Sequence, residues 1–400
     1  MTYIAERMER IETSPSSVAT QRARELRAEG RDIVALTQGQ PDFPTPDHVM
    51  DAASAGMKRG ETTYTPVGGT PVLKDAIQRK FKRENGLDYG HDQIIASNGA
   101  KQTIFNAIQA TVEPGDEIVI AAPFWGSYAE MAKYVGGVPV LVECSEKNGF
   151  KLQPEELTKA VTPKTRWLML NSPNNPSGSL YTVDEYRALG DVLSDYPRCI
   201  IMSDDMYEHI RFDDIDFVTP AQADPRLYSR TLTVNGVSKA YAMTGWRIGY
   251  AGGPVDLVQV MHKLQNQSTG NPNSVAQAAA VSALTGPQDV VKQRAKVFQG
   301  RRDFMLDRLN NCFGLSCLSP DGAFYVYPSC AGLIGKTSPA GRKIKTDRDF
   351  VIYLLEEFGI GAVHGEAYGL SPHFRLSFAA SMEDLEEACR RIQTACQALS

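Results

Sequence analysis

Apolar positions in the middle of the chain occur in short unbroken runs. Four of these runs read EIVIAA, VPVLVE, RWLMLN and CIIMSD, and they cover residues 117–122, 138–143, 166–171 and 199–204. Runs of this length are typical of strands that are buried on both faces. Helical segments lie between several of them, so the pattern predicts a mainly parallel sheet that helices cover on both sides.

A segment ahead of these runs carries helix signals at both ends. Thr70 can cap a helix, Pro71 suits the first helical position, and Gly86 is a typical terminating residue. Further helices are expected after Pro154 and from Asp184 to about Ser194. This alternation of strands and helices indicates an α/β fold.

From about residue 290 the pattern changes. The expected elements are a long charged helix at 293–309, the segment GAFYVYP, a helix around 350–358, the strand-like segments GIGAVHG and HFRLSFA, and a final helix from about 381. They predict a smaller α+β domain. We therefore expect a large domain of residues 46–289 and a small domain of residues 290–400. Residues 1–45 are expected to form an arm and part of the small domain.

Length and charge narrow the classes of function. Four hundred residues exceed the size at which one hydrophobic core usually stops growing, which agrees with two domains. A net charge of −5 argues against nucleic acid or an anionic membrane as the main partner. No stretch approaches the roughly 18 apolar residues that span a bilayer, and the N-terminus lacks the apolar core of a secretory signal. We expect a cytoplasmic protein.

Cysteine and histidine spacing predicts neither disulfides nor a metal site. The seven cysteines are an odd number without a C-x-x-C pair, and several lie in apolar runs, where a free thiol behaves as a small hydrophobe. Five histidines have no metal-ligand spacing, and we expect structural roles for them: His48, His91, His209, His262 and His373.

Polar side chains gather where the predicted strands end. RWLML is followed by NSPNNP at 171–176, CIIMS by DDMY at 204–207, and TLTVNGV by Ser238 and Lys239. In open α/β sheets, ligands bind beyond the carboxyl ends of the strands. A packed sheet needs none of these groups, so their convergence predicts one binding site at this edge.

Three motifs in this region resemble a known family. NGVSKAYAMTGWRIGY at 235–250, NSPNNPSG at 171–178 and SDDMYEH at 203–209 are similar in order and spacing to those of class I aminotransferases of the aspartate aminotransferase superfamily, in particular its bacterial aspartate and prephenate subgroup. The resemblance runs from LTQGQPDF near residue 36 to FRLSFA near 379. It implies aminotransferase fold type I, pyridoxal 5'-phosphate as cofactor, and a homodimer with shared active sites.

The resemblance also implies roles around the cofactor ring. Lys239 would bind the cofactor as a Schiff base and move the proton during catalysis. Asp204 would pair with the pyridinium nitrogen, which keeps the ring an effective electron sink. Tyr207 and Asn175 would hydrogen-bond the O3' oxygen, and Trp125 would stack on the ring.

A second group is implied at the cofactor phosphate. Arg247, eight residues after the lysine, resembles the family's phosphate-binding arginine, whose planar fork suits bidentate contact. Gly99 and Ala100 open a helix whose N–H groups and dipole attract an anion. Ser238 would lie beside the same group. Tyr64 resembles a tyrosine that reaches the phosphate from the neighbouring subunit.

Substrate recognition is implied on the opposite side. Arg375 matches the arginine that binds the α-carboxylate, assisted by Asn175 and the backbone of Gly39. Lys101 occupies the position of a cation for the distal carboxylate of a dicarboxylic substrate, and it is expected to border the cofactor as well. Trp125 is assigned to both cofactor and substrate.

Several of these residues have simpler alternatives. Asp204 can be a helix N-cap together with Asp205, which is the commoner use of Asp at a strand end. Lys101 can be an ordinary solvated lysine in the first turn of a helix. Trp125 can belong to the core, and Tyr64 can serve packing alone.

The chain also departs from the family pattern. Gly236 stands where some relatives have a phosphate-binding serine. Gln40 stands where many members of the subgroup have Glu, and His364 and Glu366 stand where small residues are more usual. None of these departures removes a residue that transamination requires.

The expected function is amino transfer between an L-amino acid, first of all aspartate or another dicarboxylic one, and a 2-oxo acid such as 2-oxoglutarate. Aromatic amino acids or prephenate are the second choice. A pyridoxal-phosphate-dependent lyase of the same fold is an alternative that would need no oxo-acid acceptor. A non-catalytic sensor is another, but such proteins carry a DNA-binding domain for which these 400 residues leave no room.

Overall fold

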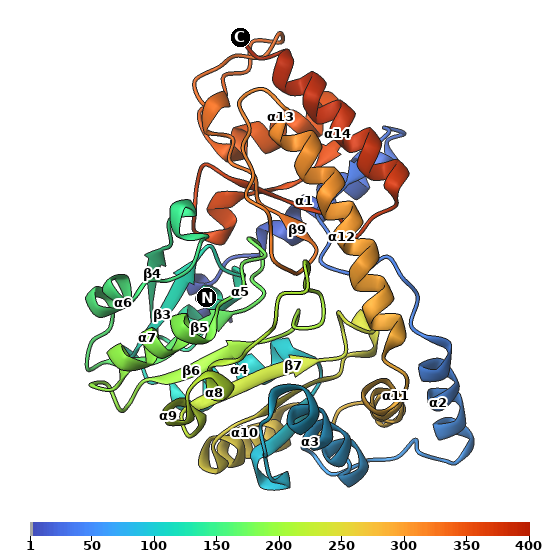
Figure 1. Ribbon diagram of the computed structural model, residues 1–400, viewed down its shortest axis with the longest axis vertical. Coiled ribbons are helices and arrows are strands. Elements are labelled where there is room, and N and C mark those ends of the chain that lie inside the picture. The colour runs from blue at the N-terminus through green and yellow to red at the C-terminus, as the bar shows by residue number, and fades with distance from the viewer. Residues whose placement is uncertain (1–2) are drawn as a thin grey trace.

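A seven-stranded sheet forms the centre of the computed structural model, which describes residues 3–400 (Figure 1). The strand order is β2-β8-β7-β6-β5-β3-β4. The bounds are β2 Ile94–Ser97, β3 Glu117–Ala122, β4 Val138–Glu143, β5 Thr165–Asn171, β6 Ile200–Asp204, β7 Thr231–Gly236 and β8 Gly249–Gly252. Strand β8 runs antiparallel to both of its neighbours, β2 and β7, and the other pairs in this sheet are parallel. The predicted mainly parallel sheet is confirmed, and the four apolar runs are strands to within one residue.

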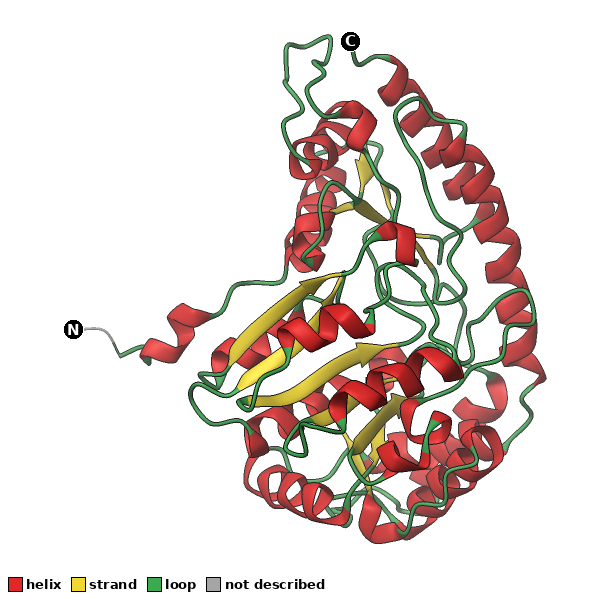
Figure 2. Ribbon diagram, turned by 60° about the vertical axis from the view of Figure 1, so that its left-hand side comes forward, coloured by secondary structure: helices red, strands yellow, loops and turns green. Residues whose placement is uncertain are grey.

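Helices cover both faces of this sheet (Figure 2). Their bounds are α2 Asp47–Lys58, α3 Pro71–Asn85, α4 Ala100–Thr111, α5 Ser127–Tyr134, α6 Pro154–Ala160, α7 Val183–Leu193, α8 Pro220–Ala223, α9 Pro225–Tyr228, α10 Val255–Ser268 and α11 Ser274–Thr285. Side chains alternate between the two faces along each strand. Ile118 and Ile120 of β3 share a core cluster with Ile104 of α4, whereas Val119 packs in a separate cluster with Leu189 of α7. Both faces of the strand are therefore buried.

Helix α3 has the ends that the sequence predicts. The Thr70 hydroxyl accepts a hydrogen bond from the Leu73 backbone N–H at 3.2 Å, and Pro71 is the first helical residue. Gly86 follows the helix in the left-handed conformation, with φ of 65°. These contacts satisfy backbone groups that the helix itself leaves free.

The C-terminal part is a smaller α+β unit. Its elements are α12 Asp289–Asn310, β9 Tyr325–Val326, α13 Asp347–Phe358, β10 Ile360–Gly361, β11 Val363–His364, β12 Phe374–Ser377 and α14 Met382–Gln397. Strands β11, β12 and β9 form an antiparallel sheet in that order. Short 3-10 helices complete the chain at η1 Glu6–Arg10, η2 His91–Gln93, η3 Glu146–Asn148, η4 Thr244–Trp246, η5 Ala331–Leu333 and η6 Gly365–Tyr368.

The N-terminal segment packs against this C-terminal unit. Helix α1 (Pro15–Ala28) is followed by β1 (Val34–Ala35), which pairs in parallel with β10. Leu26 and Ile33 share a small core cluster with Leu355 of α13. The domain boundaries at 45/46 and 289/290 stay a prediction.

Two C-terminal elements differ from the sequence expectation. The segment GIGAVHG is divided between two sheets, since β10 pairs with β1 while β11 pairs with β12. Helix α12 begins at Asp289, four residues earlier than expected. Pairing with a strand more than 300 residues away leaves no local pattern, which explains the first difference.

None of the helices formed by residues 3–400 is long and apolar enough to cross a membrane. All seven cysteines are buried free thiols, as their spacing predicts.

Candidate active site

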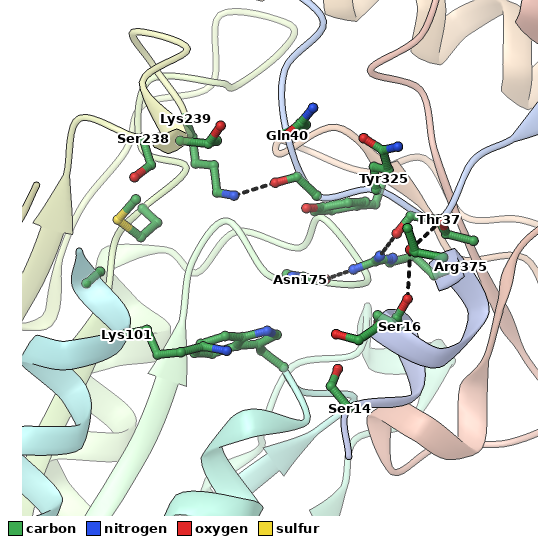
Figure 3. A pocket seen from close by; sticks show the side chains of 18 of the residues that line it. Ser14, Ser16, Thr37, Gln40, Lys101, Asn175, Ser238, Lys239, Tyr325 and Arg375 are labelled. Carbon is green, nitrogen blue, oxygen red and sulfur yellow. Dashed lines mark hydrogen bonds between the residues drawn. The ribbon is translucent and has the colours of Figure 1, made fainter. Parts of the chain in front are cut away.

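A cavity of about 1030 Å³ lies between the carboxyl edge of the large sheet and the C-terminal unit. Most of the predicted site residues line it, as Figure 3 shows for several of them. These lining residues are Gly39, Ala100, Lys101, Trp125, Asn175, Asp204, Tyr207, Ser238, Lys239, Arg247 and Arg375. Gly99 directly precedes the lining residue Ala100. Tyr64 does not line the cavity of its own chain, and its side chain is 97% exposed.

Lys239 follows β7 and extends into the cavity. Its ammonium group donates a hydrogen bond to the backbone carbonyl of Gly39 (Figure 3). Burial, helped by the positive charge of Arg375, lowers the pKa of Lys239 to about 8. An amine with such a pKa is a better base near neutral pH than an ordinary lysine.

Asp204 ends strand β6 and is buried at the floor of the site. The Tyr128 hydroxyl donates to its Oδ2 at 2.5 Å, and the Met206 backbone N–H donates to its Oδ1 at 3.4 Å. Burial raises the pKa of Asp204 to about 6, although the Tyr128 hydrogen bond opposes this shift. No helix begins here, so the alternative of Asp204 as a helix N-cap is wrong.

The raised pKa of Asp204 leads us to expect that the stability of the fold depends on pH. Its pKa is about 6 in the folded chain against 3.8 for an ordinary Asp, so the folded chain binds this proton more tightly. Its contribution to the free energy of unfolding is therefore largest at acidic pH and is lost as the pH rises from about 4 to about 6. Asp204→Asn removes this loss. In the absence of cofactor, the Tm of the variant minus the Tm of wild type is expected to be larger at pH 8 than at pH 4.5. An equal difference in Tm at both pH values would contradict this assignment.

Arg375 on β12 is an almost fully buried cation, only 3% exposed. It donates to the Asn175 side-chain oxygen at 2.9 Å and to the Thr37 carbonyl at 2.7 Å, while its Nε has no partner (Figure 3). Its guanidinium carbon lies 4.4 Å from the centre of the Tyr325 ring. A buried charge without an opposite charge is costly. Arg375 is therefore suited to binding an anion that enters the cavity.

The start of α4 and Arg247 form a second anion-binding arrangement. Gly99 has φ of 87°, a conformation that favours glycine, and a Cβ there would lie 2.2 Å from Nη2 of Arg247 and would displace the guanidinium. The Arg247 guanidinium is held by a hydrogen bond to the Thr244 carbonyl at 2.9 Å. The first N–H groups of a helix lack partners inside the helix and attract anions.

Lys101 and Trp125 contact each other in the cavity wall. The Lys101 ammonium is 4.7 Å from the centre of the Trp125 ring, and the ring meets Tyr128 edge to face. Burial and the nearby charge of Arg247 lower the pKa of Lys101. Lys101 is nevertheless an exposed residue, so its ammonium is accessible to a ligand in the cavity.

One of the departures from the family pattern, Gly236, has a structural explanation. A Cβ at Gly236 would lie 2.9 Å from the Ile248 carbonyl, so a serine has no room there. Gln40 lines the cavity. His364 and Glu366 lie outside the cavity lining, in the segment around η6.

Several lining residues were missed by the sequence reasoning. Tyr128 binds Asp204, and Tyr325 shares a hydroxyl–hydroxyl hydrogen bond of 2.9 Å with Tyr207. The position of Tyr128 three residues after Trp125 is the one local signal that was available. Residues of α1, among them Ser16, also line the cavity, but nothing in their local pattern distinguishes them from a surface helix.

The fold and this site together define an aminotransferase. Residues 31–392 match the family model for aminotransferase class I and II, and the chain belongs to this family. It is 54% identical to a probable aspartate/prephenate aminotransferase of Rhizobium leguminosarum bv. phaseoli, with both chains covered completely. It is 52% identical over the full length of both chains to an aspartate/prephenate aminotransferase of Cereibacter sphaeroides.

Solved structures agree with this assignment. The crystal structure of the aspartate aminotransferase from Rhizobium meliloti superposes with a TM-score of 0.98 at 51% identity, covering all of both chains. The aspartate aminotransferase from Thermus thermophilus with maleate gives a TM-score of 0.91 at 37% identity, covering 99% of this chain and all of that one. The predicted fold type I is therefore confirmed.

Proposed function

We propose that this enzyme transfers the amino group of aspartate, or of another dicarboxylic amino acid, to a 2-oxo acid such as 2-oxoglutarate, with pyridoxal 5'-phosphate held by Lys239. One observation carries the proposal: Lys101, Lys239, Arg247 and Arg375 all line the cavity, and within residues 3–400 none of these four cations has an ion pair with a carboxylate. A phosphate, an α-carboxylate and a distal carboxylate are the anions that such a cavity would neutralise.

The residues present fit the cofactor. The narrow cradle of Gly99, Ala100 and Arg247 suits a phosphate dianion. Asp204 supplies a buried carboxylate for the pyridine nitrogen, and its hydrogen bond from Tyr128 helps it to stay ionised above about pH 6. The cofactor, when bound, provides the electron sink that makes the α-proton of an amino acid removable.

Three further cavity residues would contact the cofactor ring. Tyr207 and Asn175 contribute a phenol and an amide for the ring oxygen, and the Trp125 indole would stack on the ring. Ser238 lines the phosphate end of the same cavity. These roles follow the family resemblance, and the shared cavity supports them.

The chain's own residues account for binding and proton movement. Arg375, held by Asn175 and Thr37, fixes the α-carboxylate and thereby presents the α-carbon to Lys239. The Lys239 amine would accept the proton from the α-carbon of the bound amino acid and would hold it for transfer to the cofactor. Its lowered pKa supports the accepting role. Asp204 and Arg375 are buried in the cavity wall, which limits the contact of their charges with water.

Lys101 supports the choice of a dicarboxylic substrate. The ammonium lies at the outer wall of the cavity without a carboxylate partner among the described residues. The relatives named above act on aspartate, and two of them carry prephenate in their names as well. Aspartate and prephenate both have a second carboxylate for Lys101 to bind. Aspartate is the first choice, and prephenate or aromatic amino acids are the second.

Lys101→Ala tests this choice. A charge-assisted hydrogen bond contributes about 1.5–3 kcal/mol, so kcat/KM for aspartate and glutamate is expected to fall by roughly 10- to 150-fold. Activity with phenylalanine should change by less than about threefold, since that substrate has no distal charge. Steady-state kinetics with each donor and 2-oxoglutarate measure both values. Lys147→Ala, at an exposed lysine outside the cavity lining, is the matched control. An equal loss with all donors, or no loss, would exclude Lys101 as the distal-carboxylate cation.

We also propose a homodimer with shared active sites. Tyr64 is almost fully exposed, so its ring is free to reach the phosphate region of a second copy. Other large apolar side chains of the N-terminal half are exposed too, among them Met50, Met57 and Val72. Sedimentation equilibrium is expected to give twice the 43.9 kDa of one chain. A monomer that retains full activity would exclude shared sites.

A further inference from the structure

Three side chains with metal-ligating atoms meet outside the active-site cavity. Asp347 is the first residue of α13, His364 is the last residue of β11, and Glu366 belongs to η6. One ligand atom from each lies within 4.8 Å of the other two. His364 Nδ1 and Glu366 Oε2 are 3.9 Å apart. His364 and Glu366 are two residues apart, but Asp347 lies 17 residues before His364, so the sequence alone does not show the three as one cluster.

The cluster contains a buried polar atom without a partner. His364 Nδ1 is sealed from solvent and forms no hydrogen bond with any described residue, and the side chain as a whole is 18% exposed. An unpartnered buried nitrogen is costly and needs an explanation. The atom faces the Glu366 carboxylate, so a cation between them would satisfy both groups.

Asp347 is the buried carboxylate of the cluster, with a residue exposure of 1%. Its Oδ2 accepts hydrogen bonds from the Glu366 backbone N–H at 3.2 Å and from the Ser371 hydroxyl at 2.7 Å. Within residues 3–400, neither Asp347 nor Glu366 forms an ion pair with a lysine or arginine, although the charge of Arg348, the next residue of the helix, acts on His364. The two carboxylates therefore gather at the imidazole without a bound lysine or arginine.

A second group of the same residue types differs in this respect. Glu84, Glu208 and His209 also meet within 4.8 Å. There the ammonium of the buried Lys80 forms ion pairs with both glutamates. The lysine already supplies the positive charge, so that group needs no metal. Of these two clusters, the one at Asp347 is therefore the one whose carboxylates have no ion pair with a lysine or arginine.

We propose that Asp347, His364 and Glu366 bind a divalent first-row transition metal ion, for which Zn²⁺ is the probe. One imidazole nitrogen and two carboxylate oxygens form a ligand set that such ions accept. The Glu366 side chain is 68% exposed, so water can complete the coordination. Tetrahedral metal–ligand bonds of about 2.0–2.2 Å place ligand atoms roughly 3.4 Å apart, so the separations between the three ligand atoms would have to shrink by up to about 1.4 Å.

The bound ion would link two segments of the chain that border the active site. It would join the start of α13 to η6, which ends at Tyr368. The Tyr368 ring lies 5.1 Å from the Arg375 guanidinium carbon, and its carbonyl accepts a hydrogen bond from the Phe124 N–H of the large sheet's loop at 3.0 Å. A metal here would therefore steady the wall behind Arg375 without taking part in the reaction.

Metal binding by the intact holoenzyme tests the proposal. Equilibrium dialysis against Zn²⁺ followed by metal analysis is expected to give one tightly bound ion per chain, and Zn²⁺ should raise the Tm. His364→Ala and Glu366→Gln should each weaken Zn²⁺ binding by at least about tenfold and abolish the Tm increase. Glu366 is mostly exposed, so its variant folds even if His364→Ala does not.

His91→Ala is the matched control, because His91 is an exposed histidine 2.8 Å from the carboxylate of Asp75. It should bind Zn²⁺ like wild type. A wild-type protein with no tight site, or one whose binding both variants retain, would overturn the proposal. The readout is metal content, so the result is independent of whether the proposed amino-transfer activity is correct.

Discussion

Lys239→Ala is expected to lower kcat for aspartate and 2-oxoglutarate by at least about 10⁴-fold. Two contributions are lost together: the covalent attachment of the cofactor, and the base that moves the α-proton, which alone contributes about 10²- to 10⁴-fold. The Lys239 amine is buried and its pKa is lowered, so the folded chain gains little stability from this charge. The variant should therefore fold, and the loss should be specific to the reaction.

Two further experiments distinguish the loss of this catalytic role from misfolding of the variant. Lys239→Arg keeps a positive charge but can neither attach the cofactor nor act as a base near neutral pH, and it is expected to be as inactive as Lys239→Ala. A small primary amine added to Lys239→Ala should restore part of the rate, because it replaces the missing base. Steady-state rates and circular dichroism measure activity and folding. Lys239→Ala with a rate within tenfold of wild type would remove Lys239 from its proposed role.

Arg375→Ala is expected to lower kcat/KM by about 10³-fold. Truncating one partner of a buried, hydrogen-bonded charge pair costs about 2–5 kcal/mol, and Arg375 is the buried cation proposed to bind the α-carboxylate. The variant also frees Asn175 and the Thr37 carbonyl, which the guanidinium now holds. KM should rise for every amino acid and every oxo acid, since all of them carry this carboxylate.

Arg375→Lys refines this expectation. It retains the charge but loses the planar fork, so it should recover only part of the lost kcat/KM. Arg308→Ala, at an exposed arginine of α12, is the matched control and should leave both constants unchanged. An unchanged KM in Arg375→Ala would mean that another group binds the α-carboxylate.

The large sheet, and the edge of it that carries the site, could be predicted because both depend on patterns within short segments of the sequence. The apolar runs identify β3, β5 and β6, and the polar residues that follow them, such as Asp204, lie where parallel strands must end together. The roles of Lys239 and Arg247 came from the family resemblance, and the structure brings both residues to one cavity.

The parts that escaped prediction depend on long-range contacts. Strand β1 pairs with β10 more than 300 residues later, and residues of α1, which precedes β1, line the cavity. Tyr325 meets Tyr207 across the two parts of the molecule, and Asp347 of α13 meets His364 of β11. None of these pairs leaves a periodic or local trace in the sequence.

A half-reaction tests the central claim most directly. Holoenzyme is mixed with L-aspartate in the absence of any 2-oxo acid, and oxaloacetate and ammonia are measured. The account predicts one oxaloacetate per chain, no ammonia, and continued turnover only after 2-oxoglutarate is added, because the amino group stays on the enzyme until an acceptor takes it. Continuous release of ammonia or oxo acid without an acceptor would contradict the account and indicate a lyase.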